Sequence, residues 1–372
     1  MTYINQQPAL FITDKGFVDF DIPGGVQICT SEFITYLEKA DFDVKIFKVT
    51  PSPTLINRVK VKLGIEVYEL YNINTCLNEI VNIINTQNIK HVFFNQLDLC
   101  YWTIKIKPHV SADVKFIGLS HGNESGDYLH DITQTAKTSF IKTWRLGKLI
   151  IKEKKIFSEL LNGVITISDN ETYIDQWLGA QNILFLPRIL EPIFINWHPE
   201  ANTVGFVGTL NHLPNIAGIK LLANQLQLNG FNGKFKLVGS PAHIGYELEK
   251  NYSFINYCGV LNDEQLKNEI GTWCLFLNPV FWYARGSSTK LSQGINWGIP
   301  VISTPAGIRG YELVDDKCVT ADNTASTFTQ MTIQALNSEQ YLNELKQTTE
   351  NNATSFNADA WANKLSLFLN AL

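Results

Sequence analysis

The stretch 285–311 limits the possible fold of this chain more than any other, because it reads in quick succession as loop, helix, turn, buried strand and glycine-rich loop. The apolar run 273–277 leads into it and reads as a preceding strand. Residues 286–289, Gly-Ser-Ser-Thr, offer side chains that cap helix starts, and Gly298 is placed to end that helix. Pro300 then opens a short β-branched run. Strand, helix and strand in this order predict an α/β fold with a parallel sheet.

Two cations flank the expected helix start, since Arg285 stands just before it and Lys290 lies in its first turn. The amino end of a helix carries the positive end of the helix dipole, so helix stability alone does not favour cations there. An anion bound between them would remove this conflict, and backbone N–H groups at a helix start bind phosphate. We therefore predict a phosphate-bearing ligand at this helix start, beside Gly286 and Ser287.

The composition is that of a compact globular protein with room for two domains. The chain has 372 residues, of which 17% are charged and 12% are aromatic, so disorder is not expected. The formal net charge of −5 argues against a nucleic-acid-binding protein. The six cysteines are scattered and form no Cys-x-x-Cys pair, which predicts reduced thiols rather than a disulfide or zinc framework.

We identify no targeting signal and no membrane-spanning segment in the sequence. The first eight residues lack a basic region and an apolar run. No apolar segment approaches the roughly 20 residues that are needed to span a bilayer. We therefore expect a cytoplasmic protein.

The first half of the chain alternates strands and helices, beginning with a βαβ unit. A buried strand at 9–13 and a strand at 43–49 enclose a helix. Gly24 and Gly25 precede this helix, where they would let the backbone approach a ligand closely; the alternative is a tight turn that needs positive φ. We place the first domain at residues 1–187. Its further strands are predicted at 91–95, 114–120, 163–168 and 183–187.

Polar residues follow the strand predicted at 114–120. His121 stands just past its carboxyl end, where open parallel sheets bind ligands, and Glu124 follows three residues later. A lone histidine is more often structural, so its position alone does not assign a role. His130 could suggest a metal pair with His121, but nothing else in the sequence completes such a site. We therefore expect no metal.

The segment 137–155 is basic and amphipathic. It carries seven Lys or Arg residues and one acid, Glu153, with apolar side chains such as Trp144 and Ile151 among them. Such a helix can lie on an anionic membrane surface, here as peripheral contact with the inner face of the membrane. The alternative is a solvated helix whose apolar side packs on the core, which is the commoner case.

The second half of the chain restarts the alternation of strands and helices. Residues 188–202, with two prolines and a tryptophan, read as a linker, and the second domain is placed at 203–357. Three of its predicted strands run into glycine turns, at Gly208, Gly239 and Gly259. These turns lie at the carboxyl ends of strands, where parallel sheets bind ligands.

The stretch 285–311 resembles the donor site of retaining glycosyltransferases with the GT-B fold, of the glycosyltransferase family 4 (group 1) type. Many members carry an Arg-Gly-x-x-x-Lys run, then a Glu, then small-Gly-x-Pro-Val-Ile-Ser-Thr. The run Phe-Val-Gly-x-Leu at 206–210, with Pro-Asn before the following helix, extends the resemblance. The matching positions of the first pattern are Arg285, Gly286, Lys290, Gly298, Pro300, Val301, Ser303 and Thr304.

The resemblance implies an architecture and a reaction. The architecture is α/β, with two Rossmann-like parallel-sheet domains facing a central cleft, and with the terminal helix 358–372 packing back on the first domain. The reaction is a hexosyl transfer from a UDP- or GDP-sugar to a glycan, lipid-linked or protein acceptor in glycan biosynthesis. It would retain the configuration of the sugar and use neither a metal nor another cofactor.

The resemblance also implies roles for individual residues. Arg285 and Lys290 would stabilise the leaving diphosphate, and His121 would contact the transferred sugar or polarise an acceptor oxygen. Glu124 is the nearest candidate for an acceptor contact or a base, and Gln293 would hydrogen-bond the donor sugar. The other donor-binding positions lie in glycine turns and at strand ends: Gly24, Gly25, Gly208, Thr209, Gly239, Gly259, Val260, Gly286, Ser287 and Gly307.

Departures from the family pattern leave two alternatives open. Gln293 replaces one family Glu, and Arg285 falls where many members have a second. Thr209 and Asn215 replace the Arg and Lys that often hold the diphosphate. One alternative is therefore a non-catalytic relative that binds a nucleotide sugar or a glycan. The other is a sugar-nucleotide epimerase, which ranks last because Glu124 is the only carboxylate that we can place in the cleft.

Overall fold

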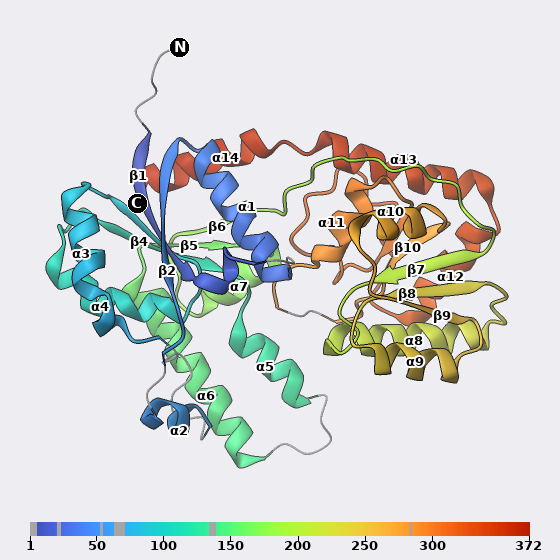
Figure 1. Ribbon diagram of the computed structural model, residues 1–372, viewed down its shortest axis with the longest axis horizontal. Helices are drawn as coiled ribbons and strands as arrows, with labels where there is room; N and C mark the ends of the chain where they lie inside the picture. Colours follow the sequence, from blue (N-terminus) through green and yellow to red (C-terminus); the bar gives the residue numbers. More distant parts are fainter. Residues whose placement is uncertain (1–5, 21–23, 53–54, 63–70, 134–138, 283–284) are drawn as a thin grey trace, which may run out of the picture. The chain divides into compact units, whose positions relative to one another are not determined.

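The computed structural model describes residues 6–20, 24–52, 55–62, 71–133, 139–282 and 285–372. These residues form two compact units. The first contains the chain up to Arg188 together with 357–372, and the second contains 189–356. Each unit has its own parallel sheet and its own buried apolar core (Figure 1).

Six strands of the described residues form the sheet of the first unit, in the order β2-β1-β3-β4-β5-β6, with every pair parallel. Leu10, Phe11 and Ile12 on β1 are at most 1% exposed, because both faces of the sheet are covered. The strand order reverses between β1 and β3, and this switch point is where such sheets bind ligands. The strands are β1 (Gln7–Asp14), β2 (Phe42–Val49), β3 (His91–Phe94), β4 (Lys115–Ser120), β5 (Gly163–Thr166) and β6 (Ile183–Phe185).

Helices connect these strands. Short 3-10 turns lie at Lys15–Phe17, Ile73–Thr75, Leu99–Trp102 and Lys107–His109, and a π-helical turn, Ile156–Leu160, follows α6. The α-helices of the first unit are α1 (Gly25–Lys39), α2 (Leu55–Lys62), α3 (Leu77–Thr86), α4 (Thr103–Ile106), α5 (Glu124–Thr133), α6 (Phe140–Lys155), α7 (Asp169–Trp177) and α14 (Ala358–Asn370).

The last helix, α14, packs in the first unit although it follows the second unit in sequence (Figure 1). Its contacts with α1 include an ion pair in which Lys39 Nζ lies 2.7 Å from Asp359 Oδ1. The Trp361 ring meets the Phe185 ring edge-on at 5.9 Å between centroids. The chain therefore leaves the first unit once, at Arg188, and returns to it once.

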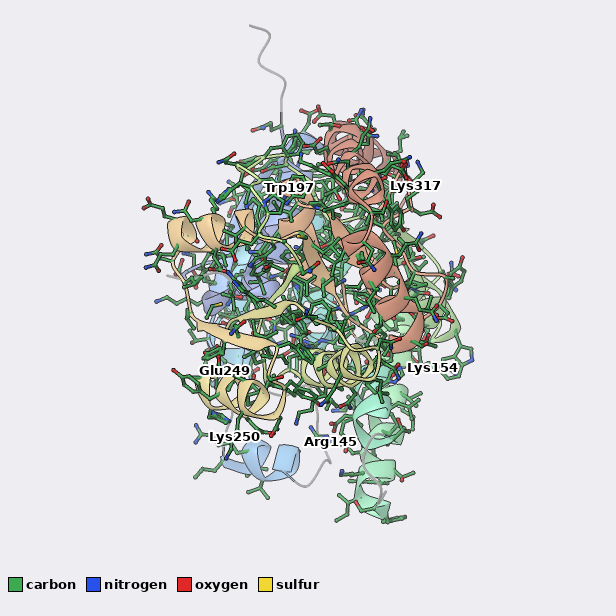
Figure 2. All side chains as sticks on the ribbon, turned by 90° about the vertical axis from the view of Figure 1, so that its right-hand side faces the viewer. Arg145, Lys154, Trp197, Glu249, Lys250 and Lys317 are labelled. Atoms are coloured by element: carbon green, nitrogen blue, oxygen red, sulfur yellow. The ribbon has the colours of Figure 1, made fainter. Side chains whose placement is uncertain are left out.

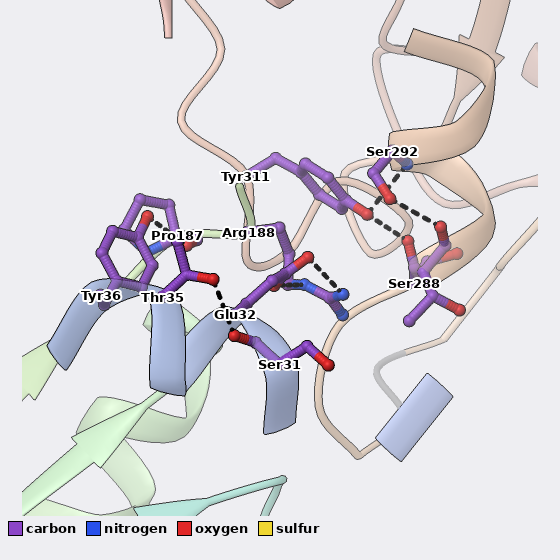
Figure 3. Close-up of polar contacts among 10 residues, drawn as sticks. Ser31, Glu32, Thr35, Tyr36, Pro187, Arg188, Ser288, Ser292 and Tyr311 are labelled. Atoms are coloured by element: carbon purple, nitrogen blue, oxygen red, sulfur yellow. Dashed lines mark hydrogen bonds and ion pairs between the residues drawn. The ribbon is translucent and has the colours of Figure 1, made fainter. Parts of the chain in front are cut away.

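The exit from the first unit is anchored by buried polar contacts (Figure 3). Arg188 is 1% exposed, and its Nε and Nη2 donate to the two carboxylate oxygens of Glu32 at 2.5 and 2.8 Å. The Tyr36 hydroxyl donates to the carbonyl oxygen of Pro187 at 2.9 Å. A bidentate Arg–carboxylate pair fixes both distance and orientation, so Arg188 is held in place against α1.

In the second unit the described residues form a five-stranded parallel sheet in the order β11-β10-β7-β8-β9. The strands are β7 (Thr203–Val207), β8 (Lys234–Val238), β9 (Ile255–Gly259), β10 (Leu275–Asn278) and β11 (Val301–Ser303). The helices are α8 (Leu213–Leu228), α9 (Ala242–Asn251), α10 (Asp263–Gly271), α11 (Thr289–Asn296), α12 (Ala325–Leu336) and α13 (Glu339–Ser355). In the described part of both units, no helix combines the length and the apolar character that crossing a membrane requires.

Most of the segment predicted as a linker, 188–202, is bound to the second unit. The Ile193 N–H donates to the carbonyl oxygen of Asn296 at 2.7 Å, and the His198 N–H donates to that of Gly271 at 2.8 Å. Trp197 Nε1 donates to the carbonyl oxygen of Trp273 at 2.7 Å. Regular hydrogen bonding along this segment makes it part of the second unit rather than a loose connection.

Candidate functional site

The helix predicted from the 285–311 stretch is α11, and it begins after the carboxyl end of β10. Gly298 ends it in the left-handed region with a φ of 67°, as predicted. The expected side-chain cap is wrong. Ser288 occupies the N-cap position without a capping bond, and its hydroxyl donates to Asn278 Oδ1 at 3.1 Å. The Ser288 hydroxyl therefore accepts no hydrogen bond from the N–H groups that begin α11.

Arg309 holds the loop before α11 and was missed in the sequence. It is 6% exposed, and its Nε donates to the carbonyl oxygen of Gly286 at 2.7 Å while Nη1 donates to that of Ala306 at 2.5 Å. The C=O and N–H of a trans peptide point in opposite directions. Because Arg309 holds the Gly286 carbonyl, the N–H of Ser287 points away from the guanidinium.

Tyr311 holds the same loop one peptide further on (Figure 3). Its hydroxyl donates to the carbonyl oxygen of Ser288 and accepts the N–H of Ser292, which lies 3.0 Å away. The N–H of Thr289 is turned away from Tyr311 by the same peptide geometry. Arg309 and Tyr311 thus orient two successive peptides by their carbonyl oxygens, which pre-organises the backbone at the start of α11.

Lys290 is held against the neighbouring helix α8. Its Nζ donates to Asn215 Oδ1 at 2.7 Å, and Asn215 Nδ2 donates in turn to the carbonyl oxygen of Thr209 at 2.7 Å. The ammonium lies 5.2 Å from the centre of the Phe206 ring. Among the described residues, no carboxylate pairs with Lys290. Among the described residues, the polar partner of this lysine is therefore a neutral amide.

The surroundings of Lys290 disfavour its charge. Burial, and next the positive charge of Arg309, lower the pKa of Lys290 to about 7. Near neutral pH this side chain is therefore only partly protonated. An anion bound beside it would raise its pKa and restore the full charge, so ligand binding and protonation are coupled here.

The predicted glycines of the β7 and β8 turns are required by packing. Gly208 and Gly239 have φ values of 155° and 144°, and a Cβ on Gly239 would lie 1.9 Å from the Gly208 carbonyl oxygen. A Cβ on Gly208 would lie 3.1 Å from Lys290 Cε, so this turn touches the lysine directly. Gly259 continues the row, since its carbonyl oxygen accepts the Gly239 N–H at 2.8 Å. The neighbouring Val260 is 70% exposed.

The remaining predicted donor residues of the second unit lie before, on and after α11 in the chain. Arg285 is exposed and Gln293 is partly buried, and the side-chain amide of Gln293 has no hydrogen-bond partner among the described residues. A Cβ on Gly307 would lie 2.4 Å from Ser303 Oγ, so packing explains this glycine. Asn278 connects Gly307 to the loop before α11. Its Nδ2 donates to the Gly307 carbonyl oxygen at 3.2 Å, and its Oδ1 accepts the Ser288 hydroxyl.

In the first unit His121 follows β4 and contacts the end of β3. Its Nε2 lies 2.9 Å from Oδ1 of Asn95, a residue that the sequence analysis missed. The rings of Phe33 and Phe17 meet the imidazole edge-on, with centroids 5.5 and 6.2 Å away. Gly122, with a φ of 124°, turns the chain immediately after the histidine. His121 is thus held in one orientation at the carboxyl edge of the sheet.

The charges of three acidic residues, which follow or end β1, β3 and β4, interact at this edge of the sheet. Burial, and next the charge of Glu124, raise the pKa of Asp98 to about 7, with a smaller effect from Asp14. Asp14 Oδ2 also accepts the Tyr71 hydroxyl at 2.8 Å. Only Glu124 was predicted from the sequence, because Asp14 and Asp98 lie far from it in the chain.

The expected loop before α1 takes a different form from a tight turn. Gly24 has a φ of −93°, and Gly25 begins α1 with ordinary backbone angles, so the alternative that needed positive φ is wrong. Gln27 closes a capping box, in which its Oε1 accepts the Gly24 N–H at 3.1 Å. Both glycines are exposed, which leaves room for close approach to the backbone.

The acid of the basic segment has a structural role. Glu153 on α6 is fully buried, and its Oε1 accepts the N–H groups of Glu124 and Ser125 at 3.1 and 3.0 Å. It therefore caps α5 from a neighbouring helix. Within the described residues, no group of three or more His, Cys, Asp or Glu side chains is arranged to hold a metal ion.

Two Rossmann-like parallel sheets, each with its polar residues at the carboxyl ends of the strands, define the GT-B fold of glycosyltransferases. The chain resembles sucrose-phosphate synthase from Thermosynechococcus elongatus, with a TM-score of 0.69 and 16% identity, over 98% of this chain and 99% of that one. It resembles TarM with a TM-score of 0.67 and 10% identity over the whole of both chains.

A third similar structure is the pneumococcal O-GlcNAc transferase GtfA in complex with UDP and GlcNAc, with a TM-score of 0.58 and 10% identity over 99% of both chains. No family model and no curated protein sequence matches this chain. Identities this low establish the fold and not the reaction.

Proposed function

We propose that the chain is a retaining glycosyltransferase that moves a hexose from a nucleotide-diphosphate sugar to an acceptor, without a metal or other cofactor. The observation that carries the proposal is Lys290, a partly buried lysine beside a pre-organised helix start, without a carboxylate partner among the described residues. Burying a cation without a counter-charge is costly, so a site of this kind favours an anionic ligand. The diphosphate of a sugar nucleotide is such a ligand.

The reaction places negative charge where this site can receive it. When the bond between the sugar and the diphosphate breaks, charge develops on the leaving phosphate oxygen. Lys290, Arg285 and the N–H groups that begin α11 supply cations and oriented donors, the arrangement that stabilises a developing anion. Gln293 lies one turn beyond Lys290 on α11 and can donate and accept hydrogen bonds with the donor sugar.

The first unit supplies groups that suit a hydroxyl-bearing acceptor. His121 and Glu124 follow β4, and Asp98 adds a carboxyl group that can hold or release a proton near neutral pH. Such groups recognise or activate hydroxyl oxygens. The proposal therefore places a glycan or another hydroxyl acceptor at the first unit. Between a UDP-sugar and a GDP-sugar we favour the UDP-sugar as the donor, since the similar GtfA structure holds UDP.

Calorimetric titration with UDP, GDP and their hexose derivatives tests the proposal. One of these should bind the wild-type chain, and Lys290→Met should weaken that binding at least 100-fold with little change in the unfolding midpoint. The matched control is Lys236→Met, which removes a partly buried lysine of the same unit that pairs with Glu269 at 2.7 Å. It should keep affinity within about threefold. Equal affinity in the two variants, or no binding to the wild type, would contradict the phosphate assignment.

Transfer itself needs a second measurement. The nucleotide sugar that binds is incubated with panels of glycans, lipid-linked sugars and peptides, and release of the nucleotide diphosphate is followed. Transfer with retained configuration, detected by NMR of the product, would support the complete proposal. Tight binding without transfer to any acceptor would instead indicate a non-catalytic relative.

Membrane contact through α6 is a second part of the proposal, and it would suit a lipid-linked acceptor. Residues 137 and 138 of the predicted basic segment lie outside the described residues; Ser139 caps α6, and 140–155 form it. Phe140, Ile141 and Ile151 are 85%, 64% and 66% exposed on this basic helix. Exposed apolar side chains interleaved with lysines match the chemistry of an anionic bilayer surface.

Other features of the first unit bear on the same proposal. Arg145 on α6 lies over the Tyr128 ring, 5.2 Å from its centre, so part of the positive charge packs on the protein. Figure 2 marks Arg145 and Lys154 on this helix. The exposed apolar residues Leu55 and Ile56 on α2, at 79% and 68%, add to the apolar surface of this unit.

Vesicle sedimentation distinguishes the two interpretations of this helix. The wild type should sediment with vesicles that contain phosphatidylglycerol and not with phosphatidylcholine alone. Ile141→Glu should lower the bound fraction at least fivefold, because it places a negative charge in the contact. The control, Leu367→Glu, changes a 72% exposed side chain on α14 and should leave binding unchanged. Equal loss in both variants, or no binding by the wild type, would favour a solvated helix.

A further inference from the structure

Asn95 is a fully buried amide at the end of β3, and every polar group of its side chain has a partner. Its Nδ2 lies 2.9 Å from Thr13 Oγ1 and 2.8 Å from Thr30 Oγ1, and its Oδ1 lies 2.9 Å from His121 Nε2. Its backbone N–H donates to the carbonyl oxygen of Ile12 at 3.0 Å. The side chain thus joins the end of β1, the interior of α1 and the residue after β4 at the switch point of the sheet.

The amide of Asn95 is oriented with its NH2 group toward the two threonines, where it donates to the Thr13 and Thr30 hydroxyls. The Thr13 hydroxyl lies 3.3 Å from the carbonyl oxygen of Asp14, and donating to this carbonyl leaves the Thr13 oxygen to accept from Asn95. The amide oxygen faces His121.

An amide oxygen accepts hydrogen bonds and cannot donate them. His121 must therefore carry a hydrogen on Nε2, since this nitrogen lies 2.9 Å from the Asn95 oxygen. A neutral imidazole has one protonated nitrogen, so the lone pair of His121 lies on Nδ1. Phe33 and Phe17 pack edge-on against the ring and restrict its rotation.

We propose that Asn95 is a positioning residue that fixes His121 as the Nε2–H tautomer, so that Nδ1 is the nitrogen that accepts a hydrogen bond or a proton from a sugar hydroxyl. The tautomer follows from the hydrogen bonds within the first unit alone. Its use in transfer rests on the proposed function.

An amide suits this role better than a carboxylate. A carboxylate at position 95 would also accept from Nε2, but its charge would stabilise the imidazolium form and occupy Nδ1 with a second proton. It would also add to the negative charge that Asp14, Asp98 and Glu124 bring to the same edge of the sheet. The neutral amide orients the ring and leaves Nδ1 with its lone pair.

The tautomer can be measured by 15N NMR of histidine-labelled protein at pH 8.5, where a neutral imidazole shows one protonated and one unprotonated nitrogen. The His121 signals are assigned by their loss in His121→Gln. We expect Nε2 to be protonated and Nδ1 unprotonated in the wild type. The opposite tautomer, or a rapid mixture of the two, would overturn the proposal, and this measurement requires no variant of Asn95 to fold.

Two substitutions extend the test. Asn95→Asp should raise the fraction of His121 that is doubly protonated, because the carboxylate stabilises the imidazolium. Thr30→Val should leave the tautomer unchanged, since Thr13 still orients the amide. A neutral His121 in Asn95→Asp with its hydrogen on Nδ1 would show that position 95 does not control the ring.

In a transfer assay Asn95→Asp should lower kcat about 10–100-fold, with the KM for the donor changed less than threefold. Equal changes in kcat and KM, or none, would show that the tautomer is not used in transfer. If the chain transfers no sugar at all, the proposed function fails, whereas the NMR result still decides the tautomer.

Discussion

The carboxyl edges of the two sheets carry opposite charge. In the second unit this edge bears Lys290 and Arg309, and burial and next the charge of Arg309 lower the pKa of Lys290. In the first unit the corresponding edge bears Asp98 and Glu124, and burial and next the charge of Glu124 raise the pKa of Asp98. In both units, groups of like charge are brought together and the charged form of one of them is disfavoured.

The contrast indicates what each edge is suited to bind. Two cations that disfavour each other are relieved by an anion, whereas a carboxyl group that keeps its proton near neutral pH can exchange it with a neutral hydroxyl compound. One fold thus supports two kinds of recognition through the residues that follow its strands. The predictions below test each edge in turn.

The largest effect is expected from Asn215→Asp. This substitution places a carboxylate where the Asn215 amide oxygen now lies, 2.7 Å from Lys290 Nζ. An ion pair would form within the site, raise the pKa of Lys290 and compete with the ligand phosphate. We expect UDP affinity to fall at least 100-fold in calorimetry. The control Asn224→Asp, on the same helix, should bind UDP normally; unchanged affinity in Asn215→Asp would mean that Lys290 does not contact the phosphate.

A smaller effect is expected from Arg309→Gln. In the wild type, UDP affinity should fall as the pH rises through about 7, because Lys290 must take up a proton to bind the anion. Removing the Arg309 charge raises the pKa of Lys290, so this fall should move to higher pH. Loss of the bond to the Gly286 carbonyl should also weaken binding about tenfold.

Arg309→Lys separates the two effects of Arg309. It keeps the charge, so the pH dependence should remain near that of the wild type, but one ammonium cannot reproduce the geometry of the guanidinium. The affinity should therefore fall about as much as in Arg309→Gln. If the pH dependence moves equally in both variants, the charge of Arg309 is not its cause.

The smallest effect is expected from Asp98→Asn, measured as the free energy of unfolding against pH. The folded pKa of about 7 lies above the ordinary value of about 4, so the unfolded chain releases its proton first as the pH rises. The wild type should lose stability between about pH 4 and pH 7. The variant has no such proton and should be more stable above pH 7, on the order of 2 kcal/mol, with the difference vanishing below pH 4. A constant difference across this range would mean that Asp98 titrates normally.

The fold was largely predictable because its strands are short, apolar and bounded by polar or glycine turns. The run at 9–13 predicted β1, and the observed strand extends it to Gln7–Asp14 by pairing with β2 along its whole length. Gly298 correctly predicted the end of α11, since a left-handed residue at that place is a local property. Boundaries shifted where neighbouring strands, rather than local sequence, decide the pairing.

The residues that hold the candidate sites were harder to predict. Serine often caps helices through its side chain, but the Ser288 hydroxyl donates instead to the side chain of Asn278, ten residues earlier. Arg309 and Asn95 act on residues that lie 23 and 26 positions away, Gly286 and His121. Their side-chain types carry no motif, and only the packing of separate strand ends brings them into contact. The sequence held one signal for Asn95. It directly follows an apolar strand, and an amide that is buried at such a place needs hydrogen-bond partners.

The placement of α14 has a consequence for the order in which the protein is made. The second unit is one continuous stretch, 189–356, whereas the first lacks its last helix until 357–372 have left the ribosome. During synthesis the later unit therefore has its whole chain before the earlier one does. We expect the nascent first unit to expose the surface of α1 that α14 covers, including Lys39, the ion-pair partner of Asp359, until residues 357–372 have been synthesised.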